Sequence, residues 1–158
     1  MNKIRRSQDS DLAELAQLYR QTVQVHGSTY YTPEQVKVWA DFATDLDHFR
    51  RFILSGTTFV CWDETGLLGF SGISQNGHIL SAYVRYDRLR QGIGTALLRT
   101  VLNYAQTQGI KRVYVEASEF SLKLFEQFGF KVYEIESLER QGVQFQRYLL
   151  ELCLPEIK

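Results

Sequence analysis

The stretch Arg90-Gln91-Gly92-Ile93-Gly94-Thr95 says most about how this 158-residue chain folds. It follows a strand predicted over 78–85 and begins a helix predicted over 92–108, in which apolar side chains recur at helical spacing. The two glycines let the backbone approach a ligand closely. The first amides of a helix lack internal partners and favour an anion. With the charge of Arg90 and the hydroxyl of Thr95, the turn predicts a phosphate or pyrophosphate site.

Two common nucleotide-binding motifs do not match this turn. No Gly-Lys-Ser/Thr follows the glycines, as the Walker pattern requires, and Leu97 occupies the third glycine position of the dinucleotide fingerprint. The strand before the turn also belongs to a predicted antiparallel meander rather than to a βαβ unit. The glycine spacing alone therefore does not identify the ligand.

Strands and helices alternate on both sides of the turn. A first helix is predicted to begin at Ser10 or Asp11 and to end at Gly27, and Thr32 and Pro33 are suited to begin a second. Strands are predicted over 4–7, 57–62, 67–74, 78–85, 111–116, 130–136 and 143–152, and further helices over 46–54, 92–108 and 118–128. This order predicts a mixed α/β single domain.

The composition narrows the classes of partner. Lysine plus arginine and aspartate plus glutamate number 18 each, so no basic excess predicts nucleic-acid binding. Cys61 and Cys153 lie in apolar strand-like runs, which predicts two buried thiols, and no residues have metal-ligand spacing. Residues 1–6 are not followed by an apolar stretch, and no window approaches a membrane span. We expect a cytoplasmic protein without a metal, a nucleic acid or a membrane as partner.

Two further segments lie in register with the glycine turn. Tyr83-Val84 precedes it, and Leu124-Phe125-Glu126-Gln127-Phe128-Gly129-Phe130 follows after one helix and one strand. Together they resemble the acetyl-CoA-binding motif and the second hallmark of the GNAT N-acetyltransferases. The motif of that family is Gln/Arg-x-x-Gly-x-Gly/Ala after its fourth strand. Segments 31–35 and 139–143 resemble one branch of small bacterial members.

The resemblance implies the fold and the cosubstrate. It implies an α/β (α+β) fold: a single domain over 1–158, with a central mixed, mostly antiparallel twisted sheet of about seven strands flanked by helices on both faces. It also implies acetyl-CoA as cosubstrate without a metal, a small-molecule or peptide amine as acceptor, and a homodimer through the closing strands. The residues implied to hold the coenzyme are Tyr83, Val84, Arg90, Gln91, Gly92, Ile93, Gly94, Thr95 and Phe125.

Two residues depart from the pattern of the family. Leu89 stands at the first motif position, where glutamine or arginine is usual. We expect little loss of coenzyme binding, because the backbone amides of residues 91–95 are implied to make the main contacts. Phe125 stands where many relatives carry a tyrosine that protonates the departing thiolate, and phenylalanine has no proton to donate. The proton donor is therefore absent or lies elsewhere.

Direct attack of an amine on the thioester needs a base, because an alkylammonium has a pKa of about 10.4 and must first lose a proton. His78 and Glu116 are the candidate bases, and the alternative for each is a solvated strand end. The candidate acids are Tyr133, Ser118 and Ser121. The alternative role of Tyr133 is that of an ordinary packed aromatic residue, and the alternative role of the two serines is helix capping.

The acceptor site is predicted on the early helices. Tyr30, Tyr31 and Trp39 lie where members of the family bind the acceptor, and they form either an aromatic wall for it or ordinary packing. The predicted activity is acetyl transfer to a primary amine. One alternative is a non-catalytic acyl-CoA or acyl-carrier binding module, which Phe125 favours, and a weaker one is an enzyme acting on nucleotide phosphates.

Overall fold

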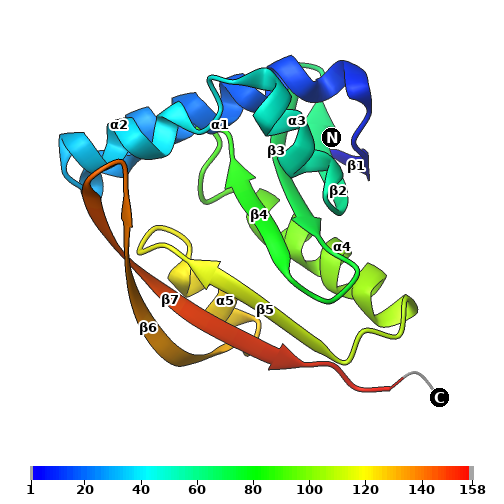
Figure 1. Cartoon of the computed structure of the whole chain (residues 1–158). Helices are drawn as coiled ribbons and strands as arrows, with labels where there is room; N and C mark the ends of the chain where they lie inside the picture. The colour runs from blue at the N-terminus through cyan, green and yellow to red at the C-terminus, as the bar shows by residue number, and fades with distance from the viewer. Residues whose placement is uncertain (1, 157–158) are drawn as a thin grey trace.

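Seven strands form two hydrogen-bonded sheets in the computed structural model, which describes residues 2–156 (Figure 1). The strands are β1 (Lys3–Arg6), β2 (Thr57–Asp63), β3 (Gly66–Ile73), β4 (Ile79–Val84), β5 (Arg112–Ala117), β6 (Lys131–Arg140) and β7 (Val143–Cys153). The helices are α1 (Leu12–His26), α2 (Pro33–Asp41), α3 (Leu46–Leu54), α4 (Ile93–Thr107) and α5 (Leu122–Gln127), with short 3-10 turns at Asp9–Asp11 and Gly27–Thr29.

The two sheets meet at one point. The strand orders are β1-β2-β3-β4 and β5-β7-β6, and all neighbours are antiparallel. Among the described residues, the isolated bridge between the sheets is a parallel one from His78 to Tyr114, where the Tyr114 N–H donates to the Gly77 carbonyl at 3.0 Å. From there β4 and β5 diverge towards α1 and α2 (Figure 1). The predicted fold class is confirmed, but the seven strands are divided between two sheets.

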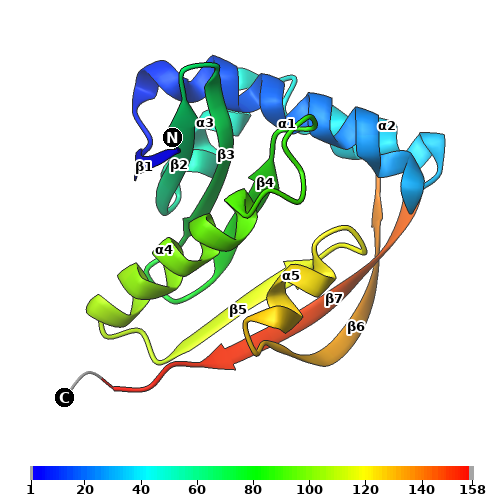
Figure 2. The same ribbon diagram turned by 180° about the vertical axis from the view of Figure 1, so that it is seen from behind.

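Helices cover both faces of the first sheet. On one face, Tyr19 of α1 and Phe49 of α3 pack with Phe70 of β3 in a buried aromatic cluster. On the other face, Ile93 and Leu97 of α4 pack against Leu68. Helices α4 and α5 lie on the same side of the molecule (Figure 2). Burial of these large side chains contributes about 1.5–3 kcal/mol each.

Gly69 allows β3 and α4 to come close together. A Cβ on Gly69 would lie 2.7 Å from the Tyr83 carbonyl oxygen and 3.1 Å from a Leu97 methyl carbon. Any side chain at this position would separate β4 from β3 or lift α4 off the sheet. The glycine therefore fixes the beginning of α4 against the end of β4.

One of the two cysteines departs from the sequence-based expectation. Cys61 is buried as predicted, but Cys153 is exposed, because it ends β7 at the margin of the sheet. No helix within residues 2–156 has the length and apolarity needed to cross a membrane.

An ion pair anchors the turn before α1. Both Arg5 guanidinium nitrogens Nη1 and Nη2 donate to the buried Asp11 carboxylate, at 2.7 and 2.9 Å, and the Gln8 N–H donates to it at 2.7 Å. The Arg5 hydrogen bond, opposed by burial and aided by the Gln8 N–H, holds the pKa of Asp11 below its ordinary value.

Replacing Asp11 by asparagine is expected to lower the free energy of unfolding by about 1–3 kcal/mol at pH 7. Because the folded-state pKa is depressed, the contribution is complete above the ordinary pKa of about 3.9 and is lost as the pH falls through the lower value. Urea unfolding at pH 7 and at stepwise lower pH measures this. Asp9→Asn on the same turn is the exposed control, and an Asp11→Asn deficit that stays constant down to pH 2 would contradict the assignment.

Candidate active site

The divergence of β4 from β5 opens a cleft of about 720 Å³. Its walls come from β4, β5, the helices α1 and α2, and the β6–β7 hairpin, and the size suits a small-molecule ligand. Of the predicted site residues, those that line it are Tyr31, Trp39, His78, Tyr83, Val84, Glu116, Ser118, Ser121 and Phe125, whereas residues 90–95, Tyr30 and Tyr133 do not. The structure thus brings together residues that are up to 94 positions apart in the chain.

A β-bulge starts the divergence of the strands. Ser81 pairs with Gly72 and Ile79 with Ile73, so Leu80 is an extra residue in β4. A bulge bends its strand and increases the local twist. The bend turns the rest of β4 away from β5, and the facing edge of β4 is left without a neighbouring strand.

The open edge of β4 presents backbone groups to the cleft. The Arg85 N–H donates to the Leu68 carbonyl at 2.7 Å, so Arg85 and Leu68 are a hydrogen-bonded pair. Because such pairs alternate along an antiparallel ladder, the backbone groups of Ala82 and Val84 point away from β3. The Val84 carbonyl accepts from the Thr22 hydroxyl of α1 at 2.9 Å. The N–H groups of Ala82 and Val84 are directed towards the cleft.

The glycine turn begins α4 with exposed amides. Gly92 is the N-cap residue and has φ +81°, a conformation that favours glycine, and Arg90 has φ +61°. The Ala96 N–H is bonded to the Gly92 carbonyl at 3.0 Å, whereas the preceding amides of Ile93, Gly94 and Thr95 have no acceptor one turn back. The N-terminus of α4 therefore presents unpaired N–H donors that suit an anion.

The glycine turn and its two flanking segments meet in space. A Cβ on Gly94 would lie 3.4 Å from Leu124 of α5 and 3.5 Å from Val84 of β4. Phe125 is fully buried on α5 and packs edge-on against Phe130, with ring centroids 5.4 Å apart. Its place in the cleft lining agrees with a coenzyme contact, but its ring carries no proton donor.

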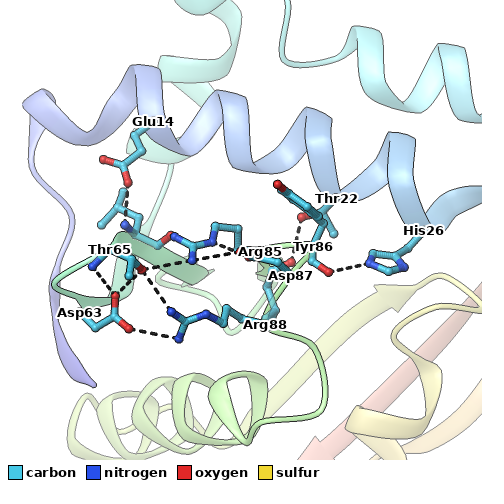
Figure 3. Close-up of polar contacts among 11 residues, drawn as sticks. Glu14, Thr22, His26, Asp63, Thr65, Arg85, Tyr86, Asp87 and Arg88 are labelled. Carbon is cyan, nitrogen blue, oxygen red and sulfur yellow. Dashed lines mark hydrogen bonds and ion pairs between the residues drawn. The ribbon is translucent and has the colours of Figure 1, made fainter. Parts of the chain in front are cut away.

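The loop between β4 and α4 is held by a polar network that the sequence did not reveal (Figure 3). Arg85 donates to Asp87 at 2.6 Å and to the Thr65 hydroxyl at 3.1 Å. Arg88 pairs with the buried Asp63 at 3.2 Å, and Asp63 also accepts the Thr65 N–H at 2.7 Å. The hydrogen bonds of Thr65 and, more weakly, the Arg88 charge hold the pKa of Asp63 below its ordinary value despite burial.

Helix α1 supports the same loop. The His26 ring nitrogen Nε2 is 2.7 Å from the Tyr86 carbonyl oxygen (Figure 3). Two residues before Tyr86, the Val84 carbonyl accepts the hydrogen bond from the Thr22 hydroxyl. Glu14 accepts the Leu67 N–H at 2.6 Å and so fixes the β2–β3 hairpin that carries Thr65. The residues before Gly92 are therefore fixed by the β2–β3 hairpin and by α1.

His78 and Glu116 form a hydrogen-bonded pair where the sheets meet. His78 Nε2 and Glu116 Oε2 are 2.6 Å apart, and the imidazole is stacked on Tyr114 with ring centroids 4.8 Å apart. Glu116 is also 3.8 Å from Arg147, which is itself paired with Glu136 at 2.6 Å. Burial would raise the pKa of Glu116, but the His78 hydrogen bond and charge and the Arg147 charge outweigh it and lower the pKa.

The aromatic residues predicted to bind the acceptor are only partly brought together. Tyr31 and Trp39 pack edge-on at 5.2 Å in the wall of the cleft, and the Trp39 Nε1 donates to the Tyr83 hydroxyl at 3.3 Å. Tyr30 does not line the cleft: it is 55% exposed and touches Phe120 with its ring edge. The 3-10 turn at Gly27–Thr29 directs these two consecutive tyrosines differently.

The three residues predicted as acids do not all lie at the cleft. Tyr133 does not line the cleft: it is 49% exposed at a bulge of β6, beside Arg112. Ser118 and Ser121 do line it, and their hydroxyls are 3.3 Å apart. Within residues 2–156, no group of three or more histidine, cysteine, aspartate or glutamate side chains is arranged to hold a metal ion.

Comparison with known proteins gives one consistent result. A family model described as an acetyltransferase (GNAT) domain matches residues 28–152. The protein described as uncharacterized N-acetyltransferase YafP of Escherichia coli K12 is 24% identical over 149 residues, which are 94% of this chain and 93% of that protein.

Solved structures share the fold. A GCN5-related N-acetyltransferase from Rhodopseudomonas palustris superposes with a TM-score of 0.93 at 21% identity, over 98% of this chain and 96% of that one. The protein yncA of Salmonella typhimurium, solved with its cofactor acetyl-CoA, superposes with a TM-score of 0.74 at 19% identity, over 100% of this chain and 96% of that one.

Proposed function

The chain belongs to the GNAT acetyltransferase family, and on this premise we propose that it transfers an acetyl group from acetyl-CoA to a primary amine. The observation that carries the proposal is the open edge of β4 running directly to the unpaired amides of α4. The extended, amide-bearing pantetheine arm of the coenzyme fits the open edge of β4. Its pyrophosphate fits the unpaired amides of α4. Both parts of acetyl-CoA therefore have a complementary surface on one continuous segment.

The backbone of β4 would also serve the reaction. When the amine nitrogen forms its bond to the thioester carbon, the carbonyl oxygen gains negative charge, and a free amide of Ala82 or Val84 stabilises it. Preorganised donors of this kind typically contribute about 3–4 kcal/mol. The carbon–sulfur bond then breaks and the thiolate leaves.

His78 is proposed as the base that takes the proton of the attacking amine. The Nε2–H of His78 donates to the ionised Glu116, which leaves Nδ1 with the lone pair that can accept a proton. Glu116 holds the imidazole in this tautomer, and its lowered pKa keeps it ionised at neutral pH. We assign Glu116 a positioning role rather than that of a second base.

No phenol stands at Phe125 to protonate the thiolate. A thiol has a pKa of about 8.5, so a thiolate is a good leaving group without assistance. We therefore propose that the thiolate leaves unprotonated. The same residue favours the second candidate, an acyl-CoA or acyl-carrier binding module without turnover.

Two measurements test these proposals in sequence. Isothermal titration with acetyl-CoA, coenzyme A and ATP is expected to show binding of the first two and none of ATP. Release of free thiol with a panel of primary amines then distinguishes an enzyme from a binding module. If neither acetyl-CoA nor coenzyme A binds, the proposed function is wrong.

Replacing Asp63 by asparagine is expected to weaken binding of acetyl-CoA by about tenfold, because Arg88 loses its buried counter-ion and the loop before Gly92 loosens. Titration calorimetry measures the affinity, and thermal unfolding measures the accompanying loss of stability. Glu64→Gln, a change on the neighbouring residue of the same hairpin, is the control. Wild-type affinity in Asp63→Asn would show that the network does not position the turn.

A further inference from the structure

The β6–β7 hairpin presents one ordered face to the cleft. Pairing of Leu138 with Phe145 and of Arg140 with Val143 places Leu138, Arg140, Phe145 and Arg147 on the same side of the two strands. All four line the cleft. Along this face the Arg147 ion pair lies near His78, the apolar pair lies in the middle, and Arg140 lies at the tip.

Four of the five carboxylate and guanidinium groups in the cleft wall are already engaged. Asp41 is paired with Lys37 at 2.7 Å, and Asp45 accepts the Asp47 and His48 amides of α3 at 3.0 and 3.1 Å. Glu116 and Arg147 belong to the network at His78. The exposed Arg140 side chain has no ion pair or hydrogen bond among residues 2–156. The arginine at the tip is thus the charge without a counter-ion in this wall.

Arg140 is exposed and lines the cleft together with the aromatic residues Tyr31, Trp39 and Phe145. Burial raises the pKa of the Tyr83 hydroxyl and that of Tyr19 more strongly, while the Arg140 charge acts on both in the opposite direction. Tyr31 packs on Trp39 and, with centroids 6.5 Å apart, on Phe145. A flat apolar pocket is therefore bordered by one unpaired guanidinium.

The tip that carries Arg140 is held in place. Gln141 and Gly142 have φ +51° and +78°, which matches the two-residue turn that closes a tight hairpin. The Gln35 side chain of α2 donates to the Gln144 carbonyl at 2.8 Å. Gln35 is itself held in the capping box of α2 with Thr32. The backbone that carries Arg140 is thereby held against α2.

We propose that Arg140 binds the carboxylate of the acceptor, so that the substrate is a free amino acid with an aromatic or large apolar side chain. The inference rests on the proposed acetyl transfer. The side chain of the amino acid would lie against Tyr31, Trp39 and Phe145, with its amine directed towards β4. A guanidinium binds a carboxylate with paired hydrogen bonds, which an uncharged amide cannot reproduce.

The test compares substrates that differ in the carboxylate alone. Thiol release from acetyl-CoA, and the tryptophan fluorescence of the coenzyme A-loaded chain, are measured with L-phenylalanine, L-phenylalaninamide and phenethylamine. L-Phenylalanine is expected to have the highest kcat/KM and the lowest Kd. The amine of the amide loses its proton more readily, so amine reactivity cannot explain a preference for the acid.

Variants of Arg140 complete the test. Arg140→Gln is expected to lower kcat/KM for L-phenylalanine at least tenfold and to leave kcat/KM for the two amines without a carboxylate unchanged. Arg140→Lys is expected to retain part of the preference, and Arg99→Gln, on the exposed face of α4, serves as control. The proposal is overturned if the acid is not preferred, if Arg140→Gln affects the three compounds equally, or if no carboxylate-bearing amine binds. In each case, acetyl-CoA binding and turnover of another amine would leave the proposed acetyl transfer standing.

Discussion

Replacing Thr95 by glutamate is expected to lower the affinity for acetyl-CoA by about a hundredfold or more, while the free protein folds normally. Thr95 is the third residue of α4, where a carboxylate interacts favourably with the helix dipole. The same carboxylate faces the anion that the unpaired amides would bind. Two unit charges about 4 Å apart near a protein surface repel by about 4 kcal/mol, and each 1.4 kcal/mol corresponds to a tenfold change in affinity.

Thr95→Gln separates charge from shape in this experiment. Glutamine has nearly the size of glutamate but no charge, so it is expected to weaken binding by no more than about tenfold. Titration calorimetry gives the affinities, and the thermal midpoint shows whether Thr95→Glu is as stable as the parent. Affinity of Thr95→Glu within a few-fold of the wild type would place the pyrophosphate away from α4.

Replacing His78 by glutamine is expected to lower kcat by about 10²–10⁴, the usual contribution of a general base. The glutamine amide preserves a donor to Glu116, so the meeting point of the two sheets is disturbed little. The KM for acetyl-CoA is expected to stay the same, because the glycine turn lies at the other end of β4.

The pH dependence distinguishes a base from a structural residue. Loss of a general base changes the pH profile of kcat, so the profile of His78→Gln is expected to differ from that of the wild type. Glu116→Gln is expected to reduce kcat less and to keep the wild-type profile. If His78→Gln shows a wild-type pH profile with reduced stability, the pair holds the sheets together and takes no proton.

Prediction from the sequence succeeds where one short segment determines the outcome. The glycines Gly92 and Gly94 next to an apolar helical stripe predict a helix start, and the structure begins α4 at Ile93 and leaves its first amides unpaired. The anion site at these amides stays a prediction. The pairing of His78 with Glu116 could not be predicted without the bridge between His78 and Tyr114, which sets the register of the two sheets within residues 2–156. Sequence patterns named both residues as separate candidates but could not show that they touch.

Other features depend on long-range geometry. Asp63 and Arg88 are 25 residues apart, and their pairing follows from the way the β2–β3 hairpin meets the loop before α4. Tyr133 is displaced because a bulge shifts the alternation of β6, and a strand pattern does not reveal which residue is the extra one. The division of seven strands into two sheets arises from a similar bulge at Leu80.

The open edge of β4 has a consequence for how the molecule behaves in a crowded solution. An unpaired strand edge normally invites strands of other molecules and leads to aggregation, and proteins protect such edges with charges or prolines. Here the edge carries Ile79, Ala82 and Val84 and has no such protection. It lies inside the cleft, whose other walls are α1, α2 and the β6–β7 hairpin, so a strand of another molecule has to enter the cleft to pair with it. These walls thereby guard against self-association while the edge remains free for its ligand.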